Sequence, residues 1–303
     1  MANVMRIDHG NLRALAAVVR EGSFERAALS LSVTPSAVSQ RIKALEDRMG
    51  RLLVQRTVPA AATADGQVLV QLAEQTALLE HDALNRLGVA DDDIPHASIP
   101  IAVNHDSLET WFVDAALQFA ARTRATLDML SEDQDHTAAL LRNGSVLGAV
   151  TTLADPVQGC RIHALGSMRY VATCTPDFHK RYFASGVNAQ TLAQAPVLVF
   201  NRKDALQARF AHKIADPAPW EPPVWWVPST RAFVQATLGG LGWTMNPLPL
   251  VQEHLDAGQL VLLRGRAWED VPLYWQHWRV NSEAMAALTD AVLSAARSLV
   301  RRR

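Results

Sequence analysis

Hydrophobic positions recur at helical spacing in the first fifty residues. The apolar stripe from Leu12 to Val19 predicts a helix over residues 8–21, and Gly22 is the residue type that commonly ends helices. Ser23 is a favourable N-cap, so a second, short helix is expected over residues 24–31.

A third helix is marked by Thr34 and Pro35, because threonine caps helices and proline fits the first helical position. This helix is expected over residues 35–49, with an apolar face that includes Ile42, and Gly50 should close it. Helix, short helix, tight turn and helix in this order predict a helix-turn-helix unit.

A small β-wing is predicted over residues 51–64 and one long helix over residues 65–87. Apolar or small positions of the long helix alternate spacings of three and four, namely Leu69, Leu72, Thr76, Leu79 and Ala83. Such a stripe needs a partner, and we expect a second copy of the chain; packing on its own domain is the alternative. Residues 88–97, rich in Asp with Gly and Pro, predict a hinge.

Strand-like and helical patterns alternate from residue 98 onward, which predicts an α/β organisation with largely parallel sheets and two lobes. Strands are expected over residues 99–103, 126–130, 146–151, 170–173, 197–200, 224–227, 242–245, 260–263 and 273–278. Helices are expected over residues 107–121, 136–142, 205–213, 231–238, 248–257 and 283–300.

Polar residues on the exposed face of the third helix are suited to base edges and phosphates. Small residues at Ala27 and Ala28 let the second and third helices approach closely. The candidate DNA-binding set is Ser23, Thr34, Pro35, Ser36, Ser39, Gln40, Arg41, Lys43, Arg51, Arg56 and Thr63. From these residues alone, a purely structural three-helix unit is the alternative.

The charge of the chain is divided unequally. The formal net charge is −1 over 303 residues, but residues 1–60 hold nine cations and five anions, a net charge of +4. The remaining residues therefore carry −5. This asymmetry indicates a head that binds a polyanion, joined to an acidic body.

Several classes of protein are disfavoured by composition and motifs. With 49% hydrophobic and 19% charged residues, the chain is typical of a globular protein, and we expect no membrane span and no secretory signal. Cys160 and Cys174 are expected as buried or half-buried thiols in a reducing cytoplasm. Nucleophile-elbow, phosphate-loop and dinucleotide motifs are absent from the sequence, so we expect neither an enzyme nor a cofactor or metal site.

Residues 22–56, GSFERAALSLSVTPSAVSQRIKALEDRMGRLLVQR, resemble the head of LysR-type transcriptional regulators, and the family's Thr-x-x-Gly falls on Thr63 and Gly66. The resemblance implies an all-α winged helix-turn-helix head, a linker helix, and an α/β effector domain with two lobes like those of periplasmic binding proteins. Their expected bounds are residues 6–64, 65–88 and 98–303, with lobe I over about 98–166 and 272–303 and lobe II over about 167–271.

Shorter segments resemble one subfamily, the regulators of basic amino-acid export of the ArgP/LysG type. They include residues 75–80, 103–112, 148–151, 229–235 and 273–275, and Val54 stands where most of the wider family has Phe. The resemblance implies an effector that is L-lysine or L-arginine, activation of an exporter gene, operator DNA and RNA polymerase as partners, and a homodimer that pairs into a dimer of dimers.

The residues near predicted strand ends suit such an effector. The first turn of a helix starting at Ser107 would hold a carboxylate, and acids such as Asp106 would hold ammonium groups. The candidate effector-binding set is Asn104, Asp106, Ser107, Glu132, Asp133, Thr151, Asn201, Asp204 and Thr230. For Ser107 the alternative is a plain helix cap, and for each acid it is a cap or a solvated loop charge.

One segment departs from the subfamily. Asn201-Arg202-Lys203-Asp204 follows Phe200, where the subfamily tends to have Asp directly. If these cations face the cleft, a neutral or acidic effector becomes the alternative. Tryptophans such as Trp226 offer either a cation–π contact to the effector or core packing. A solute-binding protein for transport is a remoter alternative, disfavoured by the DNA-binding head.

Overall fold

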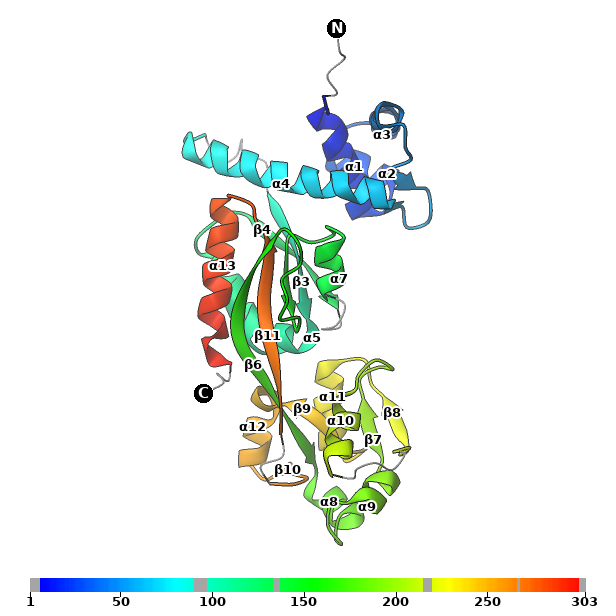
Figure 1. Cartoon of the computed structure of the whole chain (residues 1–303), viewed down its shortest axis with the longest axis vertical. Coiled ribbons are helices and arrows are strands. Elements are labelled where there is room, and N and C mark those ends of the chain that lie inside the picture. The colour runs from blue at the N-terminus through cyan, green and yellow to red at the C-terminus, as the bar shows by residue number, and fades with distance from the viewer. Residues whose placement is uncertain (1–5, 90–96, 133–136, 215–219, 266–267, 300–303) are drawn as a thin grey trace. The chain divides into compact units, whose positions relative to one another are not determined.

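In the computed structural model (Figure 1), side-chain caps set the starts of the first three helices. Asp8, Ser23 and Thr34 each accept a hydrogen bond from a backbone N–H three residues ahead. The helices are α1 (His9–Glu21), α2 (Phe24–Ser30) and α3 (Pro35–Met49), so the predicted helix-turn-helix is confirmed, with α3 matching its predicted bounds. Gly22 and Gly50 end α1 and α3 in the left-handed conformation, as predicted.

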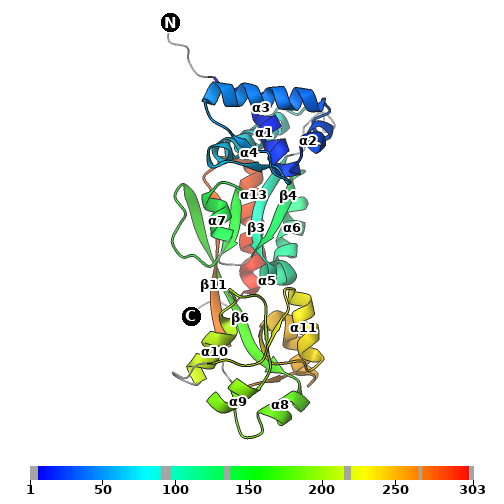
Figure 2. The same cartoon turned by 90° about the vertical axis from the view of Figure 1, so that its right-hand side faces the viewer.

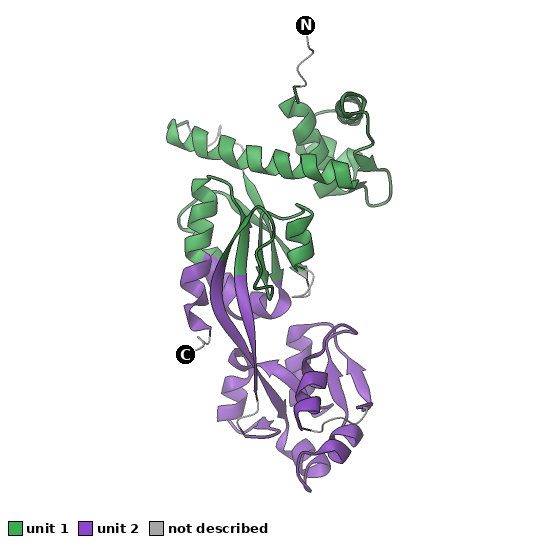
Figure 3. Cartoon of the chain, viewed as in Figure 1, with its two compact units in different colours: residues 1–103, 116–162, 275–291 green, residues 104–115, 163–274, 292–303 purple. Residues whose placement is uncertain are grey.

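The structure describes residues 6–89, 97–132, 137–214, 220–265 and 268–299 (Figures 1 and 2). Most of the predicted hinge over residues 88–97 therefore lies outside the described residues. The chain divides into two units (Figure 3): unit 1 takes residues 1–103, 116–162 and 275–291, and unit 2 takes residues 104–115, 163–274 and 292–303.

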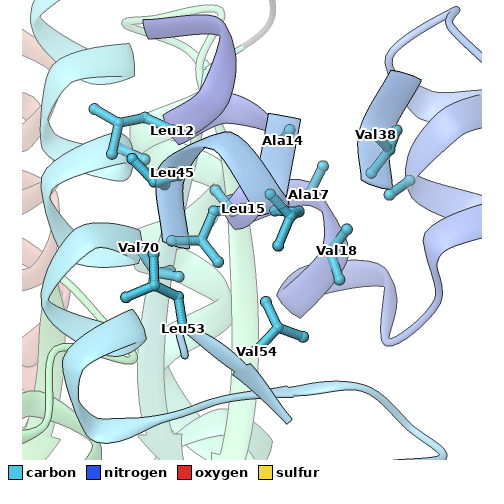
Figure 4. Packing of buried hydrophobic residues seen from close by; sticks show 14 of the residues in the cluster. Leu12, Ala14, Leu15, Ala17, Val18, Val38, Leu45, Leu53, Val54 and Val70 are labelled. Atoms are coloured by element: carbon cyan, nitrogen blue, oxygen red, sulfur yellow. The ribbon is translucent and has the colours of Figure 1, made fainter. Parts of the chain in front are cut away.

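The head of unit 1 is closed by a wing and a long helix. The wing is the antiparallel pair β1 (Val54–Gln55) and β2 (Ala61–Ala62), and the helix is α4 (Ala64–Arg86). One apolar core joins α1, α3, the wing and the start of α4 (Figure 4). Leu15, Ile42 and Leu45 in this core are fully buried. Burial of these side chains, worth about 2 kcal/mol each, holds the three-helix unit together.

The Thr-x-x-Gly motif lies at the junction of the wing and α4, where packing explains why these residue types are needed. Thr63 caps α4 by accepting from the N–H of Gly66, and its hydroxyl donates to the carbonyl of Leu52. A Cβ on Gly66 would overlap the carbonyl oxygen of Leu53 and lie 2.9 Å from the carbonyl carbon of that residue. Only glycine therefore lets the first turn of α4 pack against the wing backbone.

The rest of unit 1 is a sheet with helices. β3 (Ser98–Asn104) pairs in parallel with β5 (Gly148–Thr151), and the strand order continues to β4 (Thr126–Glu132) on one side and β11 (Trp268–Trp278) on the other. Helix α7 (Thr137–Arg142) belongs wholly to unit 1, whereas α6 (Val113–Ala120) and α13 (Glu283–Ala295) pass from one unit to the other and η3 (Ala296–Ser298) belongs to unit 2.

Unit 2 corrects the expectation of largely parallel sheets. β9 (Thr244–Pro247) and β10 (Val261–Leu262) both pair antiparallel with β6 (Cys160–Cys174). β7 (Val197–Val199) and β8 (Val224–Trp226), by contrast, pair in parallel. Hydrophobic alternation identifies a strand but not its direction, which depends on where the connecting helices return the chain.

The lengths of some elements also differ from the expectation. β6 and β11 extend well beyond the predicted residues 170–173 and 273–278, and the chain passes from one unit to the other within both. Two short helices, α8 (Pro176–Tyr182) and α9 (Ala189–Gln194), were not predicted. The remaining helices of unit 2 include α10 (Leu206–Ile214), α11 (Thr230–Leu238) and α12 (Leu248–Asp256).

Candidate functional site

The exposed face of α3 is polar and its inner face is apolar. Ser36, Gln40 and Lys43 are exposed, while Ser39 and Arg41 are half-buried. The opposite face is fixed by the core of the head (Figure 4). The helix therefore presents short polar groups and a cation on a rigid support, which is the arrangement that reads base edges in a major groove.

Three predicted DNA contacts use their hydroxyls within the fold. Ser23, Thr34 and Thr63 accept the capping hydrogen bonds of α2, α3 and α4. The exposed Pro35 begins α3. Ser23, Thr34 and Thr63 therefore order the helix starts, and each uses one hydroxyl lone pair for its capping bond.

The two wing arginines differ in their surroundings. The guanidinium carbon of Arg56 lies 5.4 Å from the centre of the Phe24 ring. Arg51 instead donates through Nη1 to Oδ1 of Asp65 in α4, at 2.8 Å. The Asp65 carboxylate partly neutralises Arg51, whereas the aromatic ring leaves the charge of Arg56 available.

The predicted stripe on α4 is divided between two faces. Leu69 is buried in the core of the head, whereas Val68, Leu72 and Leu79 expose 63%, 39% and 45% of their surface. Ala83 is exposed and Thr76 is half-buried. The apolar positions available to a partner are thus centred on Val68, Leu72 and Leu79, because Leu69 already packs inside its own domain.

The candidate effector site in unit 2 is centred on Asp106. Tyr170 on β6 donates its hydroxyl proton to Oδ2 of Asp106 at 2.6 Å. Thr230, at the start of α11, donates to Oδ1 at 3.0 Å. The structure therefore brings together Asp106 and Thr230, which lie 124 residues apart in the sequence, and adds Tyr170.

Two buried polar atoms beside Asp106 have no hydrogen-bond partner among the described residues. They are Oδ1 of Asn104 and the hydroxyl of Ser107, in residues that are 3% and 0% exposed. Buried polar atoms are normally paired, so these two atoms keep hydrogen-bonding capacity that a ligand could use.

The helix that carries Ser107 begins earlier than predicted. It opens at His105 as α5 (His105–Ser107), continues as a π-helical turn η2 (Leu108–Phe112), and leads into α6. Asn104 takes the N-cap position without a side-chain capping bond, so the expectation that Ser107 opens the helix is wrong. Single π-helical turns are frequent at functional sites.

Asp204 joins the site from the loop between β7 and α10. Its Oδ2 accepts from the N–H of Phe200 at 3.2 Å and its Oδ1 from the N–H of Leu206 at 3.0 Å. Asn201 turns the same loop, because its Oδ1 accepts from the N–H of Lys203 and of Asp204. Asn201 thus stabilises the turn that carries Asp204.

Burial and neighbouring charges set the electrostatics of Asp106. Burial raises the pKa of Asp106, while the hydroxyls of Tyr170 and Thr230 lower it; the charge of Asp204 raises it further and that of His105 lowers it. Burial and the charge of Asp106 raise the pKa of Tyr170 well above its ordinary value, so its hydroxyl stays a proton donor. A bound cation would relieve the repulsion between the two carboxylates.

Aromatic rings line the same region. The rings of His105 and Phe200 meet edge to face with centres 5.1 Å apart, and the rings of Phe200 and Phe233 do so at 6.4 Å. Trp243 and Trp275 are core residues, whereas Trp225 and Trp226 are exposed on β8. Sequence reasoning missed Tyr170 and Phe233, because their contacts in this region form only in three dimensions and leave no mark in the local sequence pattern.

The remaining predicted effector residues are Thr151, Glu132 and Asp133. Thr151 belongs to unit 1, where its buried hydroxyl accepts from the N–H of Leu153. Asp133 lies outside the described residues, as does the side chain of Glu132.

The two cysteines are buried thiols, as predicted. Burial raises the pKa of Cys160 to about 11 and that of Cys174 to about 12. No group of three or more His, Cys, Asp or Glu side chains in the described ranges converges as a metal site. None of the described helices has the length and apolar character needed to cross a bilayer.

Two family descriptions match the chain. "Bacterial regulatory helix-turn-helix protein, lysR family" matches residues 9–67, and "LysR substrate binding domain" matches residues 93–297. The chain is 45% identical to the "HTH-type transcriptional regulator LysG" of Mycobacterium tuberculosis over 98% of this chain and 96% of that protein. It is 42% identical to the "HTH-type transcriptional regulator ArgP" of Pseudomonas aeruginosa over 95% of this chain and 96% of that protein.

Solved structures agree with this assignment. ArgP from Mycobacterium tuberculosis has a TM-score of 0.84 and 45% identity, covering 98% of this chain and all of that chain. Full-length LysG from Corynebacterium glutamicum with bound effector Arg has a TM-score of 0.73 and 42% identity, covering 97% of this chain and all of that chain. The family matches, the sequence relatives and the solved structures all indicate the same family over nearly the whole length of the chain. The chain therefore belongs to the LysR family of DNA-binding transcriptional regulators.

Proposed function

We propose that this regulator senses a basic amino acid, L-lysine or L-arginine, beside Asp106 and in response activates a gene for its export. The observation that carries the proposal is the Asp106 carboxylate, enclosed by two hydroxyl donors and facing the charge of Asp204. The arginine bound to the Corynebacterium glutamicum relative supports this ligand class. The ligand is bound without chemical conversion.

The cluster offers a partner for each end of such an amino acid. Asp106 and Asp204 are acceptors for ammonium or guanidinium groups. The Ser107 hydroxyl lies in the first turn of the helical stretch that starts at His105, where backbone N–H groups favour a carboxylate. Asn104 Oδ1 is a further neutral acceptor. Thr151, Glu132, Asp133 and Asn201 stay in the proposed set as secondary contacts.

A panel of the twenty amino acids tests the ligand class by thermal shift of the full-length protein. A ligand at a hundred times its Kd adds about 2.7 kcal/mol to the free energy of unfolding. We expect stabilisation by lysine or arginine, loss of that response in Asp106→Asn, and no loss in Asp114→Asn, an exposed acid on α6. A response only to neutral or acidic amino acids would overturn the proposal in favour of the alternative effector class.

For DNA binding, we propose that α3 enters the major groove and that the wing, through Arg56, reaches the neighbouring backbone or minor groove. The polar face of α3 and the charge of +4 over residues 1–60 support this assignment. Ser39→Ala with Gln40→Ala should weaken operator binding at least tenfold without changing thermal stability. The exposed pair Ser185→Ala with Gln190→Ala serves as the control, and equal binding by both double variants would contradict the assignment.

We further propose a homodimer formed through α4 that pairs into a dimer of dimers in the cytoplasm and contacts RNA polymerase. Two heads then meet successive major grooves of a quasi-palindromic operator. The effector acts by its different affinity for two arrangements of the assembly. The exposed stripe Val68, Leu72 and Leu79 supports the dimer. The proposed domain bounds are those predicted, namely residues 6–64, 65–88 and 98–303, with the same two lobes.

A further inference from the structure

The loop that carries Asp204 also carries two cations next to an anionic site. Residues 201–204 form a tight turn, in which the N–H of Asp204 donates to the carbonyl of Asn201 at 3.1 Å. Arg202 and Lys203 are the two central residues of this turn. A positive side chain placed two residues before Asp204 would compete with a cationic ligand if it turned toward the carboxylates.

The structure shows where the Arg202 side chain goes instead. Its guanidinium carbon lies 5.1 Å from the ring centre of Trp226, the last residue of β8. Arg202 is exposed and Trp226 is 47% exposed, so this contact lies on the surface and is reversible. A cation over the face of tryptophan is the most favourable of the cation–π pairs.

The backbone around the contact is well fixed on both sides. β8 pairs with β7, whose end leads through Phe200 into the turn, and Asp204 ties both Phe200 and Leu206 by their N–H groups. The turn can thus change the direction of the Arg202 side chain without moving Asp204. Arg202 therefore rests on the aromatic face of Trp226 while standing two residues before Asp204 in the same turn.

We propose that Trp226 holds the Arg202 guanidinium away from Asp106 and Asp204, and that this contact sets the affinity of the site for a cationic effector. The inference rests on the proposed function, because it takes the acidic pair to be the effector's anchor. Released from Trp226, Arg202 would act as a tethered competitor, and a tethered group competes at a high effective concentration.

Four forms of the full-length protein test the proposal by calorimetric titration with L-arginine. Trp226→Leu should weaken binding about fivefold, the scale of an exposed cation–π contact. Arg202→Gln should bind arginine as well as or better than the parent protein. The double variant Trp226→Leu with Arg202→Gln should bind arginine with the same affinity as Arg202→Gln, because Trp226 no longer has a guanidinium to bind.

Trp225→Leu is the matched control. Trp225 precedes Trp226 on β8 and is 51% exposed. Successive side chains of a strand point to opposite faces, so Trp225 and Trp226 lie on different faces. The binding constant of Trp225→Leu should equal that of the parent protein. The proposal is overturned if Trp225→Leu and Trp226→Leu weaken binding equally, or if Trp226→Leu stays weak after Arg202 is removed.

A second measurement needs no effector. Carboxyl ¹³C titration of Asp106 in the ligand-free protein should give a lower pKa in Trp226→Leu than in the parent protein, because a released cation stabilises the carboxylate. The pKa should return in the double variant. If arginine and lysine fail to bind the parent protein but the pKa shift appears, the proposed effector class is wrong and the proposed role of Trp226 stands. If the pKa shift is absent, the proposed role of Trp226 is wrong.

Discussion

At the scale of single residues, Asp106 combines burial with two hydroxyl donors. Burial favours the protonated carboxyl, so its pKa is raised. Without ligand, the contribution of this group to the stability of the fold is therefore fully present below its ordinary pKa and is lost as the pH rises through the raised value. A cationic effector needs the opposite, ionised form.

Effector binding should therefore depend on pH. The affinity for L-arginine should rise with pH through the raised pKa of Asp106, by at most about tenfold per pH unit for one proton. Titrations between about pH 5 and pH 8 measure it. Asp114→Asn should show the same profile as the parent protein, and a dissociation constant independent of pH would separate Asp106 from the cation.

Gly66 is the second residue whose role is local and steric. Gly66→Ala places a methyl group against the Leu53 carbonyl, 2.9 Å from its carbon and closer still to its oxygen, so wing and α4 must separate. We expect the head to lose about 3 kcal/mol of stability and the operator affinity to fall. Chemical denaturation followed by binding assays measures both.

Gly50→Ala is the control for this substitution. Gly50 has a φ of +66°, but a Cβ at this position would meet nothing within 4 Å, so only the conformational cost of about 1 kcal/mol applies. Equal losses in the two variants would show that close approach at Gly66 is not what the motif protects.

At the scale of elements, the wing supplies one unneutralised cation. Each phosphate contact made by a cation adds about one to the slope of log affinity against log salt. Arg56→Ala should reduce that slope by about one, whereas Arg51→Ala should reduce it less, because Asp65 already pairs with Arg51. Fluorescence anisotropy with operator DNA at several salt concentrations measures both slopes, and identical slopes for the two variants would argue against this division.

The packing of α1 on α4 contains a second buried acid. Glu74 on α4 is 8% exposed and its carboxylate pairs with Arg20 on α1. Burial raises the pKa of Glu74, the charge and hydrogen bond of Arg20 lower it, and the charge of Asp128 raises it. The ion pair therefore offsets only part of the cost of burying the carboxylate at neutral pH.

Removing the cation alone should expose that cost. Arg20→Met should destabilise the head by about 2 kcal/mol, less than for a fully buried pair because Arg20 is half exposed. Since a raised pKa makes the acid destabilising above it, the loss should shrink as the pH falls through that value. Melting curves of Arg20→Met and of Arg20→Met with Glu74→Gln measure this, and the second variant should recover most of the loss at neutral pH.

At the scale of the whole molecule, the proposed dimer depends on the exposed stripe of α4. Leu72→Glu with Leu79→Glu should convert the dimer to a monomer and reduce operator affinity strongly, because charges would be buried across the seam. Sedimentation velocity gives the oligomeric state. Leu87→Glu, 77% exposed beyond the end of α4, should leave it unchanged. A double variant that stays dimeric would move the interface elsewhere.

The sequence by itself determined the head. Caps at Asp8, Ser23 and Thr34 and the apolar stripes between them depend on neighbours a few residues away, so local pattern predicts α1 to α4 within one or two residues. The charges counted along the sequence likewise predict a basic head. The positions of Asp106, Asp204 and Thr230 near predicted strand ends make them candidates for effector binding.

Only the tertiary structure decided which candidates meet and how. Four features depend on contacts between residues far apart in sequence. They are the strand direction along β6, the hydrogen bond from Tyr170 to Asp106, the start of the helix at His105 and the burial of Leu69. Such contacts are set by tertiary packing, which the sequence around a residue does not predict. The Arg202 side chain shows the same limit: sequence places its charge beside Asp204, and the fold provides Trp226 as its partner.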